Sequence, residues 1–265
     1  MAAAGIIIVL GLVAGSFLGL CAERLPEGLS VVHPGSRCPQ CLRPLSAWEN
    51  VPLAAFAWLR GRCRSCGARI GWPTPAMELA AALAFYWSWR RTGGGLEFVR
   101  EAFFLGCLIT LATTDARTRL LPDEITLGGW ACGLVLAVWS GPGWRGALAA
   151  SLVGAGGLAL IGWLYLRLRG RMGVGWGDVK MVGLLGAFLG GLGLLMALLV
   201  GCVSGAAAGI VQGGVVLGEQ RRRGRSWARA RATAALWPLP FGVFLALGAV
   251  VALGWGPALW RAWMG

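Results

Sequence analysis

The stretch VKMVGLLGAFLGGLGLLMALLVGCVSGAAAGIVQGGVVL, residues 179–217, contains a single charged side chain, that of Lys180. A helix of about 20 mostly apolar residues crosses the hydrocarbon core of a bilayer, so this stretch is too long for one span. The Gly190-Gly191 pair is the point where a helix is most easily interrupted. We therefore predict two spans here, over 178–190 and 193–217.

The rest of the chain repeats this pattern. Of its 265 residues, 57% are hydrophobic and 13% charged, which excludes an ordinary soluble domain and a disordered chain. The apolar runs are continuous and not alternating, which excludes a transmembrane barrel. The sequence predicts an all-α membrane protein of about eight transmembrane helices, or seven if 179–217 crosses only once. Six further apolar runs lie at 4–22, 76–90, 98–114, 123–140, 146–166 and 236–255.

Basic residues lie between the apolar runs. With eight spans and the amino terminus outside, 19 of the 24 Lys and Arg residues fall inside and five outside, which follows the positive-inside rule. The net charge of +13 therefore indicates membrane topology and contact with anionic lipid headgroups, and not nucleic-acid binding. Residues 23–75 form the one long polar segment, and we expect them to lie on the cytoplasmic side.

That loop contains two C-x-x-C pairs, separated by 21 residues, which are Cys38 with Cys41 and Cys63 with Cys66. Two such pairs at this separation are typical of a zinc ribbon, in which four thiolates surround one Zn²⁺ ion. Two disulfides, or a redox-active C-x-x-C, are the alternatives. Charge topology places the loop in a reducing compartment, which disfavours stable disulfides. We predict a small zinc-ribbon-like cytoplasmic subdomain held together by structural zinc.

The chain has only three aspartates, Asp115, Asp123 and Asp178. Asp115 ends an apolar run that leads inward and Asp178 begins one that leads outward, so both belong to the inner interface and can meet. Of two adjacent carboxylates, one stays protonated and the other can activate water, which is the chemistry of an aspartic protease. The spacing also allows simpler roles, namely an ion pair of Asp115 with Arg117 or Arg119 and a helix cap for Asp178.

Other catalytic classes lack their residues. The single histidine, His33, lies in the polar loop, and the chain has no H-E-x-x-H metalloprotease motif. Near the two candidate carboxylates, Gly175 and Gly177 would let backbone or substrate approach closely. Lys180 would shift the pKa of Asp178 or bind a substrate carbonyl. Alternatively, its side chain would simply extend to the membrane interface. Asp123 follows Pro122 at the start of a helix, so its expected role is that of an N-cap.

Together these motifs resemble the bacterial prepilin peptidases, the family of type IV leader peptidases and prepilin N-methyltransferases. Five features carry the resemblance in order along the chain. They are Gly15-Ser16-Phe17-Leu18 followed by Arg24-Leu25-Pro26, the cysteine quartet with Arg60-Gly61-Arg62-Cys63, the segment Asp115–Asp123, Gly175-Trp176-Gly177-Asp178-Val179-Lys180, and Pro240-Phe241-Gly242.

The resemblance implies an aspartic endopeptidase of the bacterial inner membrane in which Asp115 and Asp178 are catalytic. Its substrates would be type IV prepilins or type II secretion pseudopilins, cut after Gly at the cytoplasmic face, with other assembly components as further partners. The new amino terminus would then be methylated from S-adenosylmethionine. Gly19 and Trp72 depart from the family pattern in the half associated with methylation, so peptidase activity is the firmer expectation.

The resemblance also implies two regions. Residues 1–95 would hold the first span, the cysteine loop and the second span, and would be associated with methylation, whereas 96–265 would form a six-helix peptidase domain. Two alternatives belong to other classes. A proton-coupled transporter would place the acidic pair near mid-membrane, and a zinc-binding membrane scaffold would have no catalytic function.

Overall fold

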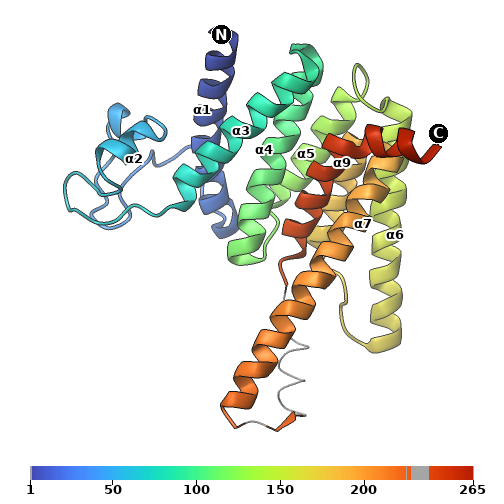
Figure 1. Ribbon diagram of the computed structural model, residues 1–265. Coiled ribbons are helices and arrows are strands. Elements are labelled where there is room, and N and C mark those ends of the chain that lie inside the picture. Colours follow the sequence, from blue (N-terminus) through green and yellow to red (C-terminus); the bar gives the residue numbers. More distant parts are fainter. Residues whose placement is uncertain (1, 225, 228–238, 265) are drawn as a thin grey trace.

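The computed structural model describes residues 2–224, 226–227 and 239–264, and within these ranges it contains helices but no β-strand (Figure 1). Short helices η1 (Leu25–Glu27), η2 (Ala47–Asn50) and α2 (Ala54–Trp58) lie in the polar segment. The long helices are α1 (Ala2–Arg24), α3 (Pro73–Thr92), α4 (Gly95–Thr118), α5 (Asp123–Leu136), α6 (Trp144–Arg169), α7 (Trp176–Arg222) and α9 (Phe241–Met264).

Each predicted apolar run overlaps one of these helices, so the all-helical prediction is confirmed for the described residues. Residues 236–238, the start of the last run, lie outside those ranges. The predicted interruption is also present, because Gly190 has φ 68° and ψ −174° within α7. This positive φ is readily accessible only to glycine, and it divides the 47-residue helix into two segments.

Length and hydropathy qualify three described stretches as candidate membrane spans, Ala2–Glu27, Trp144–Arg169 and Trp176–Arg222, with Phe241–Gly256 as a shorter apolar helix. Helix α4 carries charged residues near its start that lower its hydropathy. Its buried Arg100 donates a hydrogen bond to the Phe188 carbonyl oxygen. The structure therefore bears out a membrane protein built from helices, while the number of spans stays a prediction.

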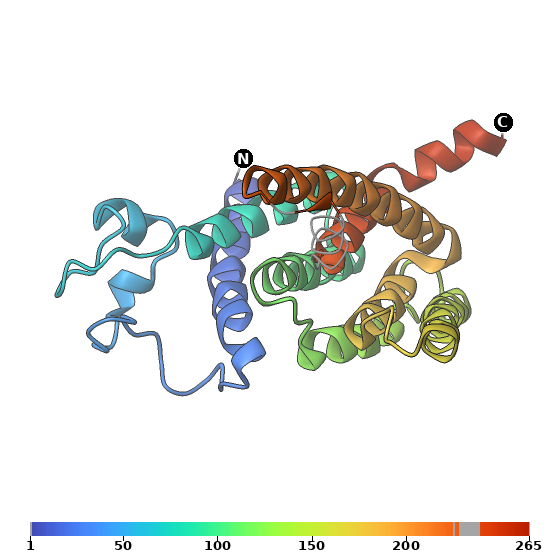
Figure 2. The same cartoon turned by 90° about the horizontal axis from the view of Figure 1, so that it is seen from below.

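The helices pack through small residues. A Cβ atom added to Gly11 or Gly15 of α1 would lie 2.5 Å from the Cα atom of Ala82 or Glu78 in α3, so the two backbones touch. The main core is made by α4, α7 and α9, and its largest fully buried side chains include Phe104, Leu108, Leu111, Met181, Leu184 and Leu245. Figures 1 and 2 place the polar segment on one flank, beyond α1, and α6 on the opposite flank.

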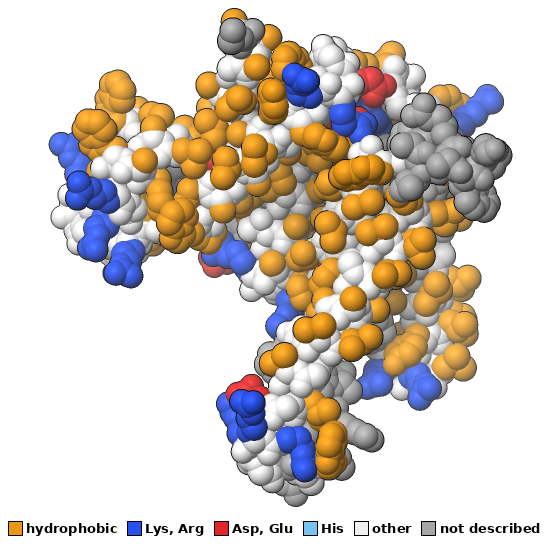
Figure 3. All heavy atoms as spheres, viewed as in Figure 1, with side chains coloured by type: hydrophobic (Ala, Val, Ile, Leu, Met, Phe, Trp, Pro, Cys, Tyr) orange, Lys and Arg blue, Asp and Glu red, His pale blue; other side chains and the backbone are white. Residues whose placement is uncertain are grey.

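The outer surface matches an apolar environment. Figure 3 shows hydrophobic side chains over most of the visible face of the helices, with basic side chains at the polar segment and at the projecting end of α7. Large apolar side chains such as Val153, Ile210 and Val211 are about three-quarters or two-thirds exposed (74%, 77% and 68%). A continuous apolar surface of this kind indicates contact with lipid.

Candidate active site and metal centre

Asp115 lies in the last turn of α4 and is buried, with 5% of its surface exposed. Its Oδ2 atom accepts a hydrogen bond from the backbone N–H of Val243, 3.2 Å away, in the first turn of α9. The amino end of a helix stabilises a carboxylate because its first N–H groups have no partner within the helix. Among the described residues no ion pair links Asp115 to Arg117 or Arg119.

Asp178 lies in the first turn of α7, three residues after the N-cap residue Gly175, so it is not the N-cap itself. Its Oδ2 atom is 3.1 Å from where a Cβ atom on Gly175 would lie, which explains why a side chain is disfavoured there. Asp115 is close enough for its charge to act on Asp178. The structure therefore places the two predicted carboxylates at the ends of two different helices, within range of each other's charge.

Leu121 lies against Gly177, which precedes Asp178, and against Gly242, which faces Asp115. A Cβ atom on Gly177 would lie 3.1 Å from Leu121 Cβ, and one on Gly242 would lie 3.1 Å from Leu121 Cδ2 and 2.9 Å from Asp115 Oδ2. Gly177 and Gly242 thus leave the space that Leu121 and the Asp115 carboxylate occupy. The sequence motif Pro240-Phe241-Gly242 drew attention to this segment without giving it a role.

The expectation that Asp123 caps a helix is wrong. Asp123 is the first residue of α5, the N-cap position belongs to Pro122, and the cap has no side-chain hydrogen bond. Instead, Lys180 Nζ donates to both carboxylate oxygens of Asp123, at 2.6 and 2.8 Å. Lys180 is therefore held by Asp123 and not free at the interface, and this ion pair joins α5 to α7 two residues beyond Asp178.

The four cysteines of the polar segment meet as the spacing predicts. The Sγ atoms of Cys38, Cys41, Cys63 and Cys66 all lie within 4.8 Å of one another, and all four cysteines are free. The Cys38–Cys66 and Cys41–Cys63 sulfur distances are 3.7 and 4.0 Å. Four sulfurs about 2.3 Å from a tetrahedral zinc ion are about 3.8 Å apart, so these residues fit a metal site and do not form disulfides.

Each pair belongs to a tight turn of the same construction. The N–H of the residue after the second cysteine donates to the carbonyl of the first, at 2.9 Å for both Leu42 to Cys38 and Gly67 to Cys63. Both residues have positive φ, 58° at Leu42 and 68° at Gly67. The glycine in this place was predictable from sequence, whereas Leu42 gives no such signal because leucine rarely adopts this conformation.

The surroundings of the four thiols shift their pKa values in different directions. The amides of Cys66 and Ser65 lower the pKa of Cys63 to about 6, and the amides of its own turn lower the pKa of Cys38. Cys66 behaves differently, because burial and the neighbouring thiols outweigh a favourable bond from the Ala68 amide and raise its pKa to about 11. Four thiolates in contact therefore need a cation, which a divalent metal would supply.

The described residues therefore form a helical membrane protein with a four-cysteine cluster that fits a metal ion and two carboxylates at the ends of later helices. The Bacterial Peptidase A24 N-terminal domain model matches residues 9–92, and the Type IV leader peptidase family model matches residues 102–210. No solved structure matches the chain significantly.

Curated relatives agree with these matches. The prepilin leader peptidase/N-methyltransferase of Burkholderia pseudomallei (strain K96243) is 36% identical over 285 residues, which cover 94% of this chain and 84% of the relative. The protein of the same name from Aeromonas hydrophila is 32% identical, with coverages of 97% and 92%. That from Myxococcus xanthus (strain DK1622) is 37% identical over 77% of this chain and 62% of the relative. The chain belongs to the type IV leader peptidase family and is a peptidase.

Proposed function

We propose that this protein is an aspartic endopeptidase that removes the leader of type IV prepilins or type II secretion pseudopilins, cutting after Gly at the cytoplasmic face of the bacterial inner membrane. The observation that carries the proposal is that Asp115, in the last turn of α4, lies close enough to Asp178, in the first turn of α7, for its charge to act on it. The relatives' names supply the substrate class.

In the proposed mechanism the two carboxylates hold one water molecule. One carboxylate takes a proton from this water as its oxygen attacks the scissile carbonyl carbon, and the protonated partner donates a hydrogen bond and then its proton to the carbonyl oxygen. The C–N bond then breaks as the first carboxyl group gives its proton to the leaving nitrogen, while the second carboxylate takes a proton from a hydroxyl of the tetrahedral intermediate, so the pair is again singly protonated. Asp115, held by the α9 amide, is fixed in orientation throughout.

For the membrane we propose eight spans, formed by α1, α3, α4, α5, α6, the two segments of α7 and α9. Basic residues favour the orientation in which the polar segment, Asp115 and Asp178 share the cytoplasmic side. The charged residues of α4 are compatible with this arrangement because they are paired. Glu101, for example, accepts hydrogen bonds from Arg91 and Ser88.

We also propose that the protein has two functional regions, 1–95 and 96–265, which is supported by family models that match on either side of residues 93–101. In the first region Cys38, Cys41, Cys63 and Cys66 would hold a structural Zn²⁺ ion, since four thiolates leave no coordination position for catalysis. S-adenosylmethionine, when bound to the region 1–95, would supply a methyl group to the new amino terminus of the cleaved substrate. The relatives' names include this second activity.

The decisive experiment uses the purified protein in detergent and a synthetic peptide with a basic leader, a Gly and an apolar helix, with products analysed by mass spectrometry. Asp115→Asn and Asp178→Asn should each abolish cleavage after Gly, because each removes one member of the acid–base pair while keeping its size. The matched control is Glu124→Gln, which neutralises an exposed carboxylate in the first turn of α5 and should cleave normally.

Outcomes separate the proposed peptidase from its alternatives. Cleavage by either Asp variant at the wild-type rate would exclude the proposed pair. If the folded wild-type protein does not cleave the peptide, the next measurement is proton uptake into proteoliposomes. Proton uptake would favour a transporter. Loss of function on Cys substitution alone would favour the scaffold.

A further inference from the structure

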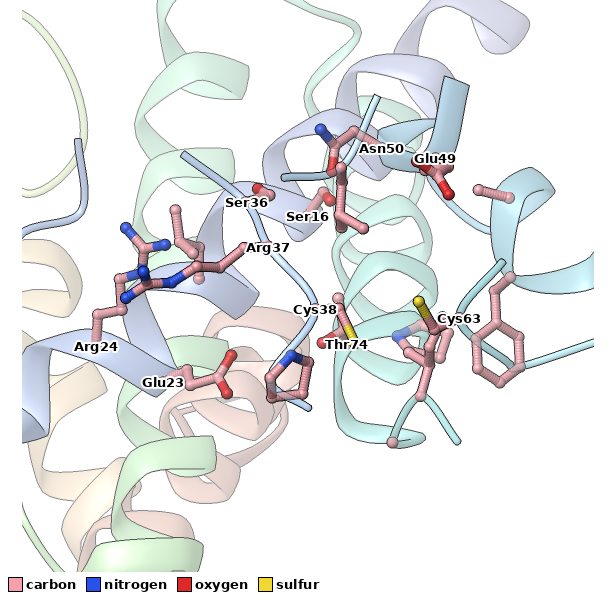
Figure 4. Close-up of a pocket in the computed structure, with 18 of the residues that line it drawn as sticks. Ser16, Glu23, Arg24, Ser36, Arg37, Cys38, Glu49, Asn50, Cys63 and Thr74 are labelled. Carbon is pink, nitrogen blue, oxygen red and sulfur yellow. The ribbon is translucent and has the colours of Figure 1, made fainter. Parts of the chain in front are cut away.

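A cavity of about 550 Å³ lies between α1, α3 and the polar segment, away from the acidic pair. This volume is within the usual range for small-molecule sites. Figure 4 shows Arg24 and Arg37 together on one side of the cavity, Glu49 and Asn50 on another, and Cys38 and Cys63 from the two metal-binding turns in its wall. The metal centre therefore shapes this cavity.

Glu78 of α3 lines the same cavity and is an unusual residue for its position. It is buried, with 5% of its surface exposed, yet among the described residues it forms no ion pair. Its Oε2 atom accepts a hydrogen bond from the Leu53 N–H at 2.8 Å, and that is its one hydrogen bond within those ranges, so Oε1 has no protein partner there. Buried carboxylates are normally paired, because an isolated buried charge is costly. Glu78 therefore points to a missing cationic group.

Charge over the whole cavity points the same way. Four carboxylates line it, those of Glu23, Glu27, Glu49 and Glu78, against the three guanidinium groups of Arg24, Arg37 and Arg69, so the lining has no excess of positive charge although the chain has a net charge of +13. Glu49 already pairs with Arg43 at 2.5 Å, outside the cavity lining. None of the three lining guanidinium groups forms an ion pair in the described part of the chain. Arg24 donates hydrogen bonds to the carbonyl oxygens of Ser30 and Pro34, whereas Arg37 is exposed and can bind an anionic group of a ligand.

We propose that this cavity is the binding site of the methyl donor S-adenosylmethionine, with Glu78 as the counter-charge of its sulfonium group. This proposal rests on the proposed methylation activity. The donor carries two positive groups, a sulfonium and an ammonium, and one carboxylate, which complements the unpaired carboxylates and Arg37. Phe56, also in the lining and tilted against Trp72 with ring centroids 5.0 Å apart, offers an aromatic face to the adenine.

A purely structural role for Glu78 is the simplest alternative, since it holds the Leu53 amide, and Leu53 has a positive φ of 55°. Glu78→Gln distinguishes the two roles. The glutamine side chain has the same size and keeps an oxygen to accept the Leu53 hydrogen bond, but it loses the negative charge. A structural residue would tolerate this change, whereas a counter-charge would not.

The test compares two ligands that differ at the sulfur, S-adenosylmethionine, which is a sulfonium, and S-adenosylhomocysteine, which is an uncharged thioether. Dissociation constants for both are measured by isothermal titration calorimetry on the zinc-loaded, detergent-purified full chain. Relative to wild type, Glu78→Gln should weaken binding of the sulfonium ligand by at least about fivefold and change binding of the thioether far less, because only the former loses a charge interaction. Glu124→Gln is the matched control.

Cleavage of the leader peptide by the same samples keeps the two proposals separate. Normal cleavage with a selective loss of sulfonium binding supports the site. Equal binding of both ligands by wild type and Glu78→Gln overturns it, as does a wild-type protein that cleaves but binds neither ligand. If Glu78→Gln instead weakens binding of the cleaved peptide, whose amino terminus is also cationic, the cavity belongs to the substrate and the proposal is wrong. Absence of cleavage by wild type would count against the peptidase alone.

Discussion

Gly242 positions the Asp115 carboxylate by leaving room for it, and Gly242→Ala should therefore slow cleavage. A Cβ atom at residue 242 would lie 2.9 Å from Asp115 Oδ2, whereas ordinary contacts begin at 3.4 Å, so the carboxylate would have to move by 0.5 Å. A misplacement of 1 Å in a catalytic group costs about 10²-fold in rate, so 0.5 Å corresponds to about tenfold. The fold itself should tolerate alanine, which favours a helix more than glycine does.

The assay measures kcat and KM for the leader peptide with wild type, Gly242→Ala and Gly128→Ala in the same detergent. Gly128 lies in α5, where an added Cβ atom would meet nothing within 4 Å, so it controls for the loss of a glycine. We expect a tenfold lower kcat with KM nearly unchanged for Gly242→Ala only. A wild-type kcat for a folded Gly242→Ala protein would refute the role of Asp115 geometry in the reaction.

Three further changes test other parts of the structure. Lys180→Met and Asp123→Asn should each lower the cleavage rate by no more than about fivefold, and the double variant by no more than either, because an ion pair with side chains 28% and 58% exposed contributes about 0.2–1 kcal/mol. Cys63→Ser should lose the bound zinc, measured by plasma mass spectrometry, and should make the polar segment sensitive to proteases, because the site has only its four thiolates to hold it. Gly248→Ala should destabilise the protein by about 1–3 kcal/mol in thermal unfolding, because its Cβ atom would overlap the carbonyl oxygen of Ala197 between α9 and α7.

Each of these has a result that would contradict it. A loss of several hundredfold in Lys180→Met with a normal Asp123→Asn would mean that the ammonium acts directly on Asp178 or the substrate. Full zinc content in Cys63→Ser would exclude four-thiolate coordination. Equal stability of Gly248→Ala and Gly213→Ala would show that the α7–α9 crossing is looser than described, since a Cβ atom at Gly213 meets nothing within 4 Å.

Much of the fold could be predicted from the sequence because a bilayer imposes long apolar runs, and the break at Gly190 follows from a run too long for one span. The cluster of four cysteines was also predictable, since metal ligation fixes the spacing of its ligands along the chain. Helix direction also predicted that Asp115 and Asp178 lie near each other, and the structure places them within range of each other's charge. Their common membrane interface stays a prediction.

Long-range polar pairs were not predictable from one sequence. The Lys180–Asp123 ion pair joins residues that are 57 positions apart, and neither residue carries a local signal for the other. The amide of Val243 that holds Asp115 is a backbone group, so no side chain identifies it. Glu78 reads as an ordinary polar residue in an apolar helix, and only its burial beside a cavity and its lack of an ion pair within the described residues reveal its interest.

The placement of Asp115 in a last helical turn and Asp178 in a first one bears on how a helical substrate is cut. A bond in the middle of a membrane helix cannot adopt the extended form a protease requires until several backbone hydrogen bonds are broken, each at a cost of several kcal/mol in lipid. At the amino end of a helix the first amides have no such bonds to lose. In the proposed reaction, the two carboxylates act on the substrate at the amino end of its helix, where the backbone amides are not hydrogen-bonded within the helix. The enzyme therefore does not have to unwind the substrate helix before cleavage.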